Sequence, residues 1–290
     1  MIVLLAFGKP SYGFAAYNLA VSLKNFNHEV PIALFYEKKT VGQLTDFSVF
    51  DTAIELKQDQ VYNKGKLDPA KVKVHIYDLV EQLPGKDFLY LDVDALAFKD
   101  IMPLFELLKK KKGYYLTDVV GQGKKADVIN YSIWAPNDFI WEWFELNSKS
   151  VYPAIQSSYA YIKKCKAAEK FFEKVKEYYF KGFPIERQTM RWGGTIADEL
   201  LFSGTCAKVN LIPDSGVSPI FFGWKYDPRS PTTLAEDYYL LAIYGNGKGR
   251  TLTKKQYWDL YDKLGSQYAK KMGRPFFKNL HIKTNKHANG

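Results

Sequence analysis

The sequence predicts an α/β protein with a mostly parallel, twisted sheet flanked by helices. Three observations predict this class. Residues 2–7 are an unbroken apolar run, which is typical of a strand buried on both faces. A polar loop, a helix over 14–23 with one apolar face, and a second apolar run over 30–35 follow. This order of strand, helix and strand opens a parallel sheet, and apolar runs continue to alternate with helical patterns further along the chain.

The later elements follow from the same two patterns. Strands are expected where short apolar or alternating runs occur, and helices where apolar residues recur at intervals of three or four. The expected strands are 52–56, 88–91, 114–118, 127–134 and 156–162, and the expected helices are one ending near Gln82, 104–112, 166–180 and 196–202. No repeat, low-complexity tract or linker is visible, so we expect a single domain over 1–245 and a C-terminal extension over 246–290.

Composition excludes several classes of protein. Of the 290 residues, 47% are hydrophobic and 25% are charged, which is close to the average of soluble globular chains and excludes disordered and collagen-like proteins. No apolar run approaches the ~18 residues of a membrane span, and the first residues lack the basic start of a signal peptide. Cys165 and Cys206 form no Cys-x-x-Cys pair. We therefore expect a cytoplasmic protein with reduced cysteines.

Positive charge is concentrated at the C-terminus. The chain carries a net charge of +10, and residues 246–290 hold eleven basic and two acidic side chains. Aromatic residues are interleaved with this charge, which predicts a folded segment: Tyr257, Trp258, Tyr261, Phe276 and Phe277. The asymmetry favours an anionic partner such as a nucleotide diphosphate, a nucleic acid or an acidic membrane surface. The alternative is a solvated basic tail.

The most informative acidic residues follow the expected strand 88–91. Asp92 and Asp94 come at its carboxyl end, which is where open α/β sheets place ligands. If the strand stays regular the two side chains point to opposite faces, and if it bends there both can reach one site. Carboxylate oxygens suit Mn²⁺ or Mg²⁺, which can bridge the oxygens of a diphosphate. The alternative is that both acids are solvated residues of a turn.

The residues around this pair resemble a known family. The block Leu89–Ile101 (LYLDVDALAFKDI), with Pro103–Leu107 (PLFEL) after it, resembles the signature of GT-A glycosyltransferases, in particular the glycogenin-like and bacterial lipopolysaccharide hexosyltransferase group. Asn18–Lys24 (NLAVSLK) resembles the first helix of that family. The similarity covers about the first 110 residues and, more loosely, 196–202. It implies a GT-A fold and the metal-dependent transfer of a sugar from a nucleoside diphosphate, usually UDP, to a hydroxyl acceptor.

The resemblance also implies roles for individual residues. Asp92 would contact the metal and the ribose, and Asp94 would chelate the metal. The loop after the first strand would hold the base and ribose, through Ala6, Phe7, Gly8, Lys9 and Tyr12. Independently of the family, Gly8 permits a close approach of the backbone, and Tyr12 can stack on a base or simply pack on the first helix.

A second acidic pair lies near residue 200. Asp198 and Glu199 resemble the family's acidic pair at a helix start beside the sugar, with Gln156, Ser157 and Ser158 on a strand set against it. An inverting enzyme needs a carboxylate that deprotonates the acceptor hydroxyl, whereas a retaining one could bind sugar hydroxyls with it. Asp198 is the first choice for the catalytic residue and Glu199 the second. The alternative is that both only complement the helix N-terminus.

One departure from the family concerns the third metal ligand. Metal-dependent members commonly supply a histidine from a C-terminal segment, but the nearest counterpart, 242–250, contains none. Lys248 and Arg250 in this stretch are expected to clamp the diphosphate. The third ligand is then His281, our choice, or one of the alternatives His287 and the side-chain oxygen of Asn246, or it is missing.

Competing functions remain at this point. Paired acids on a strand also occur in nucleotidyltransferases, although Gly8–Gly13 matches poorly the glycine-rich loop with which those enzymes bind phosphate. A non-enzymatic nucleic-acid-binding protein would explain the basic C-terminus, but no DNA-binding motif is visible. For a glycosyltransferase, the charge predicts a polyanionic acceptor. This would be a hydroxymethylated base in bacteriophage DNA, with activity in the host cytoplasm, or an acidic cell-surface glycan or lipid.

Overall fold

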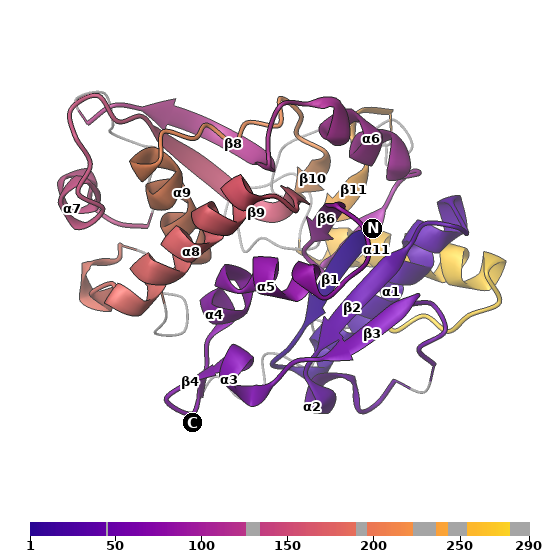
Figure 1. The fold of residues 1–290 in the computed structure, drawn as a ribbon. Coiled ribbons are helices and arrows are strands. Elements are labelled where there is room, and N and C mark those ends of the chain that lie inside the picture. Colours follow the sequence, from indigo (N-terminus) through magenta and orange to yellow (C-terminus); the bar gives the residue numbers. More distant parts are fainter. Residues whose placement is uncertain (45, 126–133, 190–195, 223–235, 243–253, 279–290) are drawn as a thin grey trace. The chain divides into compact units, whose positions relative to one another are not determined.

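The computed structural model describes residues 1–44, 46–125, 134–189, 196–222, 236–242 and 254–278 (Figure 1). The chain forms two compact units whose segments interleave along the sequence. Unit 1 consists of 1–56, 91–107 and 218–290, and unit 2 consists of 57–90 and 108–217. Strands and helices alternate in both units, which confirms the predicted α/β class. The expected boundary at 245 and 246 lies outside the described residues.

Unit 1 is built on three parallel strands. These are β1 (Ile2–Ala6), β2 (Ile32–Tyr36) and β3 (Thr52–Glu55), in the order β3-β2-β1. Every residue of β1 is buried, as its apolar run predicted. Helix α1 (Pro10–Phe26) connects β1 to β2, and a short helix, α2 (Lys38–Val41), follows β2.

Helix α1 begins at Pro10 rather than at Phe14, which corrects the expected boundary. Proline is well suited to the first turn of a helix, because its fixed φ matches the helix and its missing N–H would have no partner there. The loop after β1 is therefore only Phe7–Lys9. Tyr12 lies in the first turn of α1 and not in the loop.

A second, small sheet in unit 1 contains β7 (Ala95–Ala97), β10 (Ile220–Phe222) and β11 (Leu240–Ala242). Strand β11 pairs in parallel with β10 and antiparallel with β7, with Ala95 opposite Ala242. Helix α6 (Met102–Lys110) follows β7, and helix α11 (Lys254–Lys271) packs against α1.

In unit 2, β6 (Asp87–Leu91, with 87–90 in this unit), β9 (Tyr152–Lys163) and β8 (Tyr115–Gly123) are neighbours in that order. Strands β8 and β9 are antiparallel with two register shifts. Both are longer than expected, and the expected strand 127–134 lies almost wholly outside the described residues. The helices of this unit are α3 (Gln58–Val61), α4 (Pro69–Val74), α5 (Ile76–Glu81), α7 (Asn137–Trp143), α8 (Lys166–Lys181) and α9 (Asp198–Lys208), and a hairpin joins β4 (Tyr62–Asn63) to β5 (Lys66–Leu67).

Helix α9 begins two positions later than expected and continues to Lys208. It packs against β9, where the backbone N–H of Ile155 donates to Ser203 Oγ at 3.1 Å. Phe202 of α9 stacks on the fully buried ring of Tyr115, with ring centroids 5.6 Å apart. These contacts fix the start of α9, and with it Asp198 and Glu199, against the sheet of unit 2.

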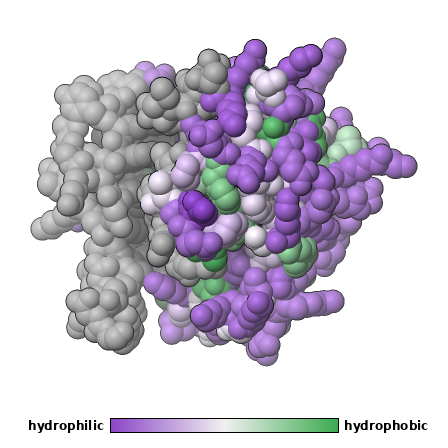
Figure 2. Space-filling model, turned by 90° about the vertical axis from the view of Figure 1, so that its left-hand side faces the viewer, coloured by the Kyte–Doolittle hydropathy of each residue, from purple (hydrophilic) through white to green (hydrophobic). Residues whose placement is uncertain are grey.

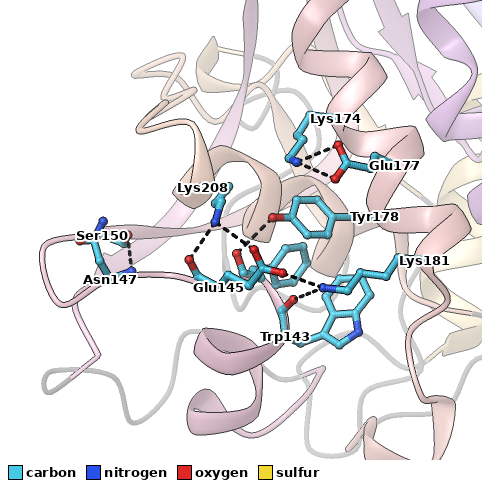
Figure 3. Close-up of polar contacts among 10 residues, drawn as sticks. Trp143, Glu145, Asn147, Ser150, Lys174, Glu177, Tyr178, Lys181 and Lys208 are labelled. Carbon is cyan, nitrogen blue, oxygen red and sulfur yellow. Dashed lines mark hydrogen bonds and ion pairs between the residues drawn. The ribbon is translucent and has the colours of Figure 1, made fainter.

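A polar cluster at the end of α7 ties three helices of unit 2 together (Figure 3). Glu145 follows α7 with a φ of +53°. Its side chain lies 3.1 Å from the Nζ of Lys181 on α8, and its backbone oxygen accepts a hydrogen bond from Lys208 on α9 at 2.9 Å. Lys181 also lies over the ring of Trp143, 5.4 Å from its centroid. Since these groups are largely exposed, each ion pair stabilises little and the cluster serves mainly to orient the helix ends.

In the coloured part of Figure 2, most side chains are hydrophilic, and the hydrophobic ones form small separate patches. None of the helices in the described part of the chain is both long enough and apolar enough to cross a bilayer.

Candidate functional site

Asp92 and Asp94 lie in the turn between β6 and β7, and we call residues 92–94 the acidic turn. Both aspartates are half-buried, and Val93 between them is buried. Because the strand ends at Leu91, the alternation of a regular strand no longer directs the two carboxylates to opposite faces. The bend that the sequence left open is therefore present.

The acidic turn is anchored from its C-terminal side. The N–H of Ala97 in β7 donates to the buried hydroxyl of Ser22 on α1 at 2.9 Å, and that hydroxyl donates to the backbone oxygen of Leu19 at 2.7 Å. The pairing of β7 with β11 holds the other side of this short strand. The residues that follow Asp94 thus have a fixed position in unit 1.

The donor atoms of the acidic turn fit Mg²⁺ or Mn²⁺. Proteins bind Mg²⁺ through one or two carboxylates and leave the remaining positions to water and substrate phosphates. Two aspartates of this kind are present. Within the described ranges no group of three His, Cys, Asp or Glu side chains is arranged to hold a metal. His281, the expected third ligand, lies outside the described residues, as do Lys248 and Arg250.

The loop after β1 has a left-handed glycine and a carboxylate that sequence reasoning missed. Gly8 has a φ of +89°, and its N–H donates to Glu37 Oε2 at 2.8 Å. The same oxygen accepts a hydrogen bond from Thr40 Oγ1 at 3.1 Å. Glu37 follows β2 directly, and its own N–H donates to the backbone oxygen of Ala6 at 2.8 Å. The loop is thus held at the carboxyl edge of the parallel strands, where such sheets bind ligands.

The other expected loop residues differ in what they can offer. Ala6 is buried at the end of β1, and its backbone oxygen accepts the N–H of Glu37. Phe7 is half-buried and Lys9 is exposed. The Tyr12 side chain is 44% exposed on the first turn of α1. Packing on the first helix therefore leaves part of its surface exposed.

A second constellation, within unit 2, surrounds the first two residues of α9. Asp198 Oδ2 lies 3.0 Å from Lys73 Nζ and accepts a hydrogen bond from Ser157 Oγ at 2.7 Å. Lys73 Nζ also donates to Ser157 Oγ at 3.3 Å and lies over the ring of Tyr90, 5.6 Å from its centroid. We call Lys73, Ser157, Asp198, Glu199 and Trp134 the carboxylate cluster.

Glu199 has different partners. Its Oε1 accepts the backbone N–H of Ser157 at 3.2 Å, and its Oε2 accepts the indole N–H of Trp134 at 2.9 Å. Burial and the neighbouring charge of Asp198 raise the pKa of Glu199 to about 7, although Lys73 and the two N–H donors act in the opposite direction. Burial also tends to raise the pKa of Asp198, but the charge of Lys73 and the Ser157 hydrogen bond outweigh it, so that pKa lies below its ordinary value.

The carboxyl groups of Asp198 and Glu199 are therefore suited to different chemical roles. Asp198 stays ionised at neutral pH, and Glu199 can take up or release a proton there. Their partners come from β9, α4 and the segment before α7, so the pair does more than complement a helix N-terminus. Lys73 and Trp134 carry no local signal in the sequence, because only the tertiary fold brings them to α9.

Comparisons with known proteins agree with this description at the level of the fold. No family model matches the chain, and no curated protein sequence matches it. The structure is similar to that of the galactosyltransferase LgtC in complex with donor and acceptor sugar analogues, with a TM-score of 0.51 and 14% identity over 92% of this chain and 96% of LgtC.

Two further solved structures are similar over less of their own length. The bifunctional glycosyltransferase WbbM matches with a TM-score of 0.53 and 10% identity, over 93% of this chain and 51% of WbbM. The glycosyltransferase GlyE of Streptococcus pneumoniae TIGR4 matches with a TM-score of 0.52 and 13% identity, over 93% of this chain and 63% of GlyE. The chain thus spans about half of WbbM and nearly all of LgtC. It has the GT-A fold of these glycosyltransferases, as the sequence predicts.

Proposed function

We propose that the chain is a glycosyltransferase that moves a sugar from a nucleoside diphosphate donor, a UDP-sugar in the first instance, to a hydroxyl acceptor with the help of Mn²⁺ or Mg²⁺. The observation that carries the proposal is the acidic turn. In a chain with the fold of known glycosyltransferases, two half-buried aspartates bend away from the carboxyl end of a buried strand. This is the donor set that a diphosphate-bound divalent cation needs.

In this proposal, the residues of unit 1 bind the donor nucleotide. Asp92 and Asp94 hold the cation, which when bound offsets negative charge on the diphosphate. The backbone of Phe7–Lys9, kept in place by Glu37, approaches the nucleotide, and Lys9 and Tyr12 supply a cation and a stacking surface. Lys248, Arg250 and His281 keep the roles expected from the sequence, as proposals.

The carboxylate cluster supplies proton transfer and sugar binding. The family resemblance favours Asp198 as the catalytic residue, but Lys73 and Ser157 lower the basicity of its carboxylate. Glu199, whose pKa is about 7, is better matched to removing the proton of an acceptor hydroxyl near neutral pH. We therefore propose Glu199 as the proton acceptor and Asp198 as an ionised group that binds sugar hydroxyls.

The test is a donor screen. Nucleoside diphosphate sugars are incubated with the protein and Mn²⁺, and free nucleotide is followed. We expect turnover of one donor class, loss of that turnover in Asp94→Ala, and little effect of Asp59→Ala, which changes an exposed aspartate of α3. Turnover that persists in Asp94→Ala would contradict the role of the acidic turn. Release of pyrophosphate from a nucleoside triphosphate would instead indicate a nucleotidyltransferase.

The acceptor class rests on charge. Because the excess of basic residues lies in 246–290, we propose a polyanionic acceptor, either modified DNA or an acidic glycan or lipid. We further propose that the reaction takes place in the cytoplasm.

A further inference from the structure

Three polar side chains of the segment 18–24 of α1 make long-range contacts in unit 1. This is the segment that resembles the first helix of the glycosyltransferase family. Lys24 Nζ lies 2.9 Å from Asp51 Oδ2 at the start of β3. Ser22 Oγ accepts the N–H of Ala97 in β7. Asn18 bonds to Phe277, beyond the end of α11. These polar side chains on a largely buried helix thus have structural partners that are distant in sequence.

Asn18 clamps a short segment after α11, residues 272–278, which we call the strap. The N–H of Phe277 donates to Asn18 Oδ1 at 3.1 Å, and Asn18 Nδ2 donates to the backbone oxygen of Phe277 at 2.9 Å. Asn18 is only 1% exposed. A buried amide that bonds both backbone groups of one residue fixes the register of the strap on α1.

Aromatic packing and an ion pair hold the strap as well. The ring of Phe277 stacks on Phe14, with centroids 4.3 Å apart. Phe276 lies on Gly265 of α11, where an added Cβ would come within 1.9 Å of its ring. Arg274 forms an ion pair with Asp46 at 2.6 Å. The strap is therefore seated along α1 and α11, two helices that pack against each other (Figure 1).

Helix α1 connects the strap to the acidic turn. Asn18 Nδ2 also donates to the hydroxyl of Tyr261 at 3.2 Å, and Tyr261 is fully buried. On the same helix, Ser22 Oγ accepts the N–H of Ala97, three residues after Asp94. Asn18 and Ser22 lie one helical turn apart on the same face of α1. One face thus holds the strap, Tyr261 and the strand that begins directly after Asp94.

We propose that the strap, through Asn18 and Ser22 of α1 as positioning residues, fixes the acidic turn and so sets its affinity for a divalent cation. The cation-binding part of this inference rests on the proposed function, whereas the positioning part does not. The strap thereby makes the C-terminal segment a functional part of unit 1, although none of its described residues is a metal ligand.

Gly265→Ala tests the proposal, since it displaces Phe276 without removing a polar group. We expect hydrogen exchange of the Phe277 amide and of the amides of 93–97 to become at least ~10-fold faster, and the affinity for Mn²⁺, measured by calorimetry with the metal alone, to fall ~10-fold, as for other groups that orient metal ligands. The control Gln267→Ala changes an exposed position of the same helix and should alter neither quantity.

Ser22→Ala separates the link from the strap. It removes only the hydroxyl that accepts the Ala97 N–H, so exchange of the Phe277 amide should stay near that of the unmodified protein while exchange of 93–97 becomes faster and the affinity for Mn²⁺ falls. The proposal is overturned if Gly265→Ala frees the Phe277 amide but leaves both the exchange of 93–97 and the Mn²⁺ affinity unchanged. If the unmodified protein binds no Mn²⁺, the metal-dependent function fails, and the exchange of 93–97 alone decides whether the strap positions the turn.

Discussion

Asp198 and Glu199 are neighbours in sequence, yet the partners of their carboxyl groups make them chemically different. Asp198 bonds to an ammonium and a hydroxyl, whereas Glu199 bonds to two neutral N–H donors. Neighbouring acids whose pKa values are pushed apart are the usual arrangement for assigning one group to proton transfer and the other to charge stabilisation.

Glu199→Gln should therefore remove a titration as well as a carboxylate. If Glu199 accepts the acceptor proton, the rate of the unmodified enzyme rises with pH through about 7, since only the ionised form is a base. The variant should lose ~10²–10⁴-fold in kcat and lose this rise. The measurement is a pH profile of sugar transfer between about pH 5 and pH 9. A variant that keeps the rise would assign it to another group.

The same titration affects stability. The folded-state pKa of Glu199 is higher than its ordinary value, so folding binds a proton between the two values and the free energy of unfolding falls as pH rises through about 7. We expect Glu199→Gln to gain stability relative to the unmodified protein on going from pH 4 to pH 8. Urea denaturation at the two pH values measures this difference, and an unchanged difference would mean that the carboxyl is not perturbed.

Lys73 is predicted to stabilise unit 2 through Asp198. Lys73→Met leaves a largely buried carboxylate without its cation and should lower the free energy of unfolding by about 2 kcal/mol at pH 7. The loss should shrink as pH falls through the lowered pKa of Asp198, because the protonated acid no longer needs the ammonium. Lys170→Met, on the exposed face of α8, is the control. Equal losses in the two variants would contradict the role of the ion pair.

The sequence could predict the acids of both constellations and, through the family resemblance, Ser157 beside Asp198 and Glu199, but not the other partners. A local strand pattern precedes Asp92 and Asp94, and a local helix pattern contains Asp198 and Glu199. No local pattern marks Lys73 and Glu37, because each meets its partner only through the tertiary fold. The sequence alone also could not show that Asp198 and Glu199 have different pKa values, because the pKa of each carboxyl group depends on its burial and on its hydrogen-bond donors.

At the scale of elements, α1 shows where patterns stop being informative. Its existence was predictable from the apolar spacing, but its start was not, because Gly8–Gly13 has the composition of a loop. The helix is also buried on most sides. The need for glycine at position 13 comes from tertiary packing, which no local pattern shows. Helix α1 passes so close to α2 there that an added Cβ would lie 2.4 Å from the backbone oxygen of Thr40.

Gly13→Ala is accordingly expected to destabilise the protein, even though alanine is the better helix former. The clash is with backbone, so α1 or α2 must shift, and the free energy of unfolding should fall by about 1–3 kcal/mol. Gly42→Ala is a matched control, because its Cβ would meet the nearest atom at 3.5 Å and its φ is −59°. Thermal and urea unfolding check the pair. A Gly13→Ala protein as stable as Gly42→Ala would show that the two helices separate easily.

For the whole molecule, the α/β class followed from alternation of apolar runs, but the division into two units did not. Each unit is assembled from segments that are far apart in the chain, and no linker or low-complexity tract in the sequence marks where one unit ends and the other begins. The position of excess charge, in contrast, is a property of the sequence itself and supports a prediction without further structure.

If the basic residues of the C-terminal segment bind a polyanion, the affinity of the protein for that polyanion should depend on the salt concentration. Each phosphate neutralised contributes about −0.9 to the slope of log K against log salt for duplex DNA. Removing residues 279–290 deletes Lys283 and Lys286 and leaves the strap intact, so the slope should become shallower by up to about 2 units. Lys110→Ser with Lys112→Ser removes the same charge from an exposed segment elsewhere and should change the slope less.

Fluorescence anisotropy with labelled duplex DNA and with a sulfated glycan, each at several salt concentrations, compares the two acceptor classes. Steeper dependence for one of them identifies the polyanion that the charge is suited to, and equal slopes for both truncated and full-length chains would show that the tail does not contact it.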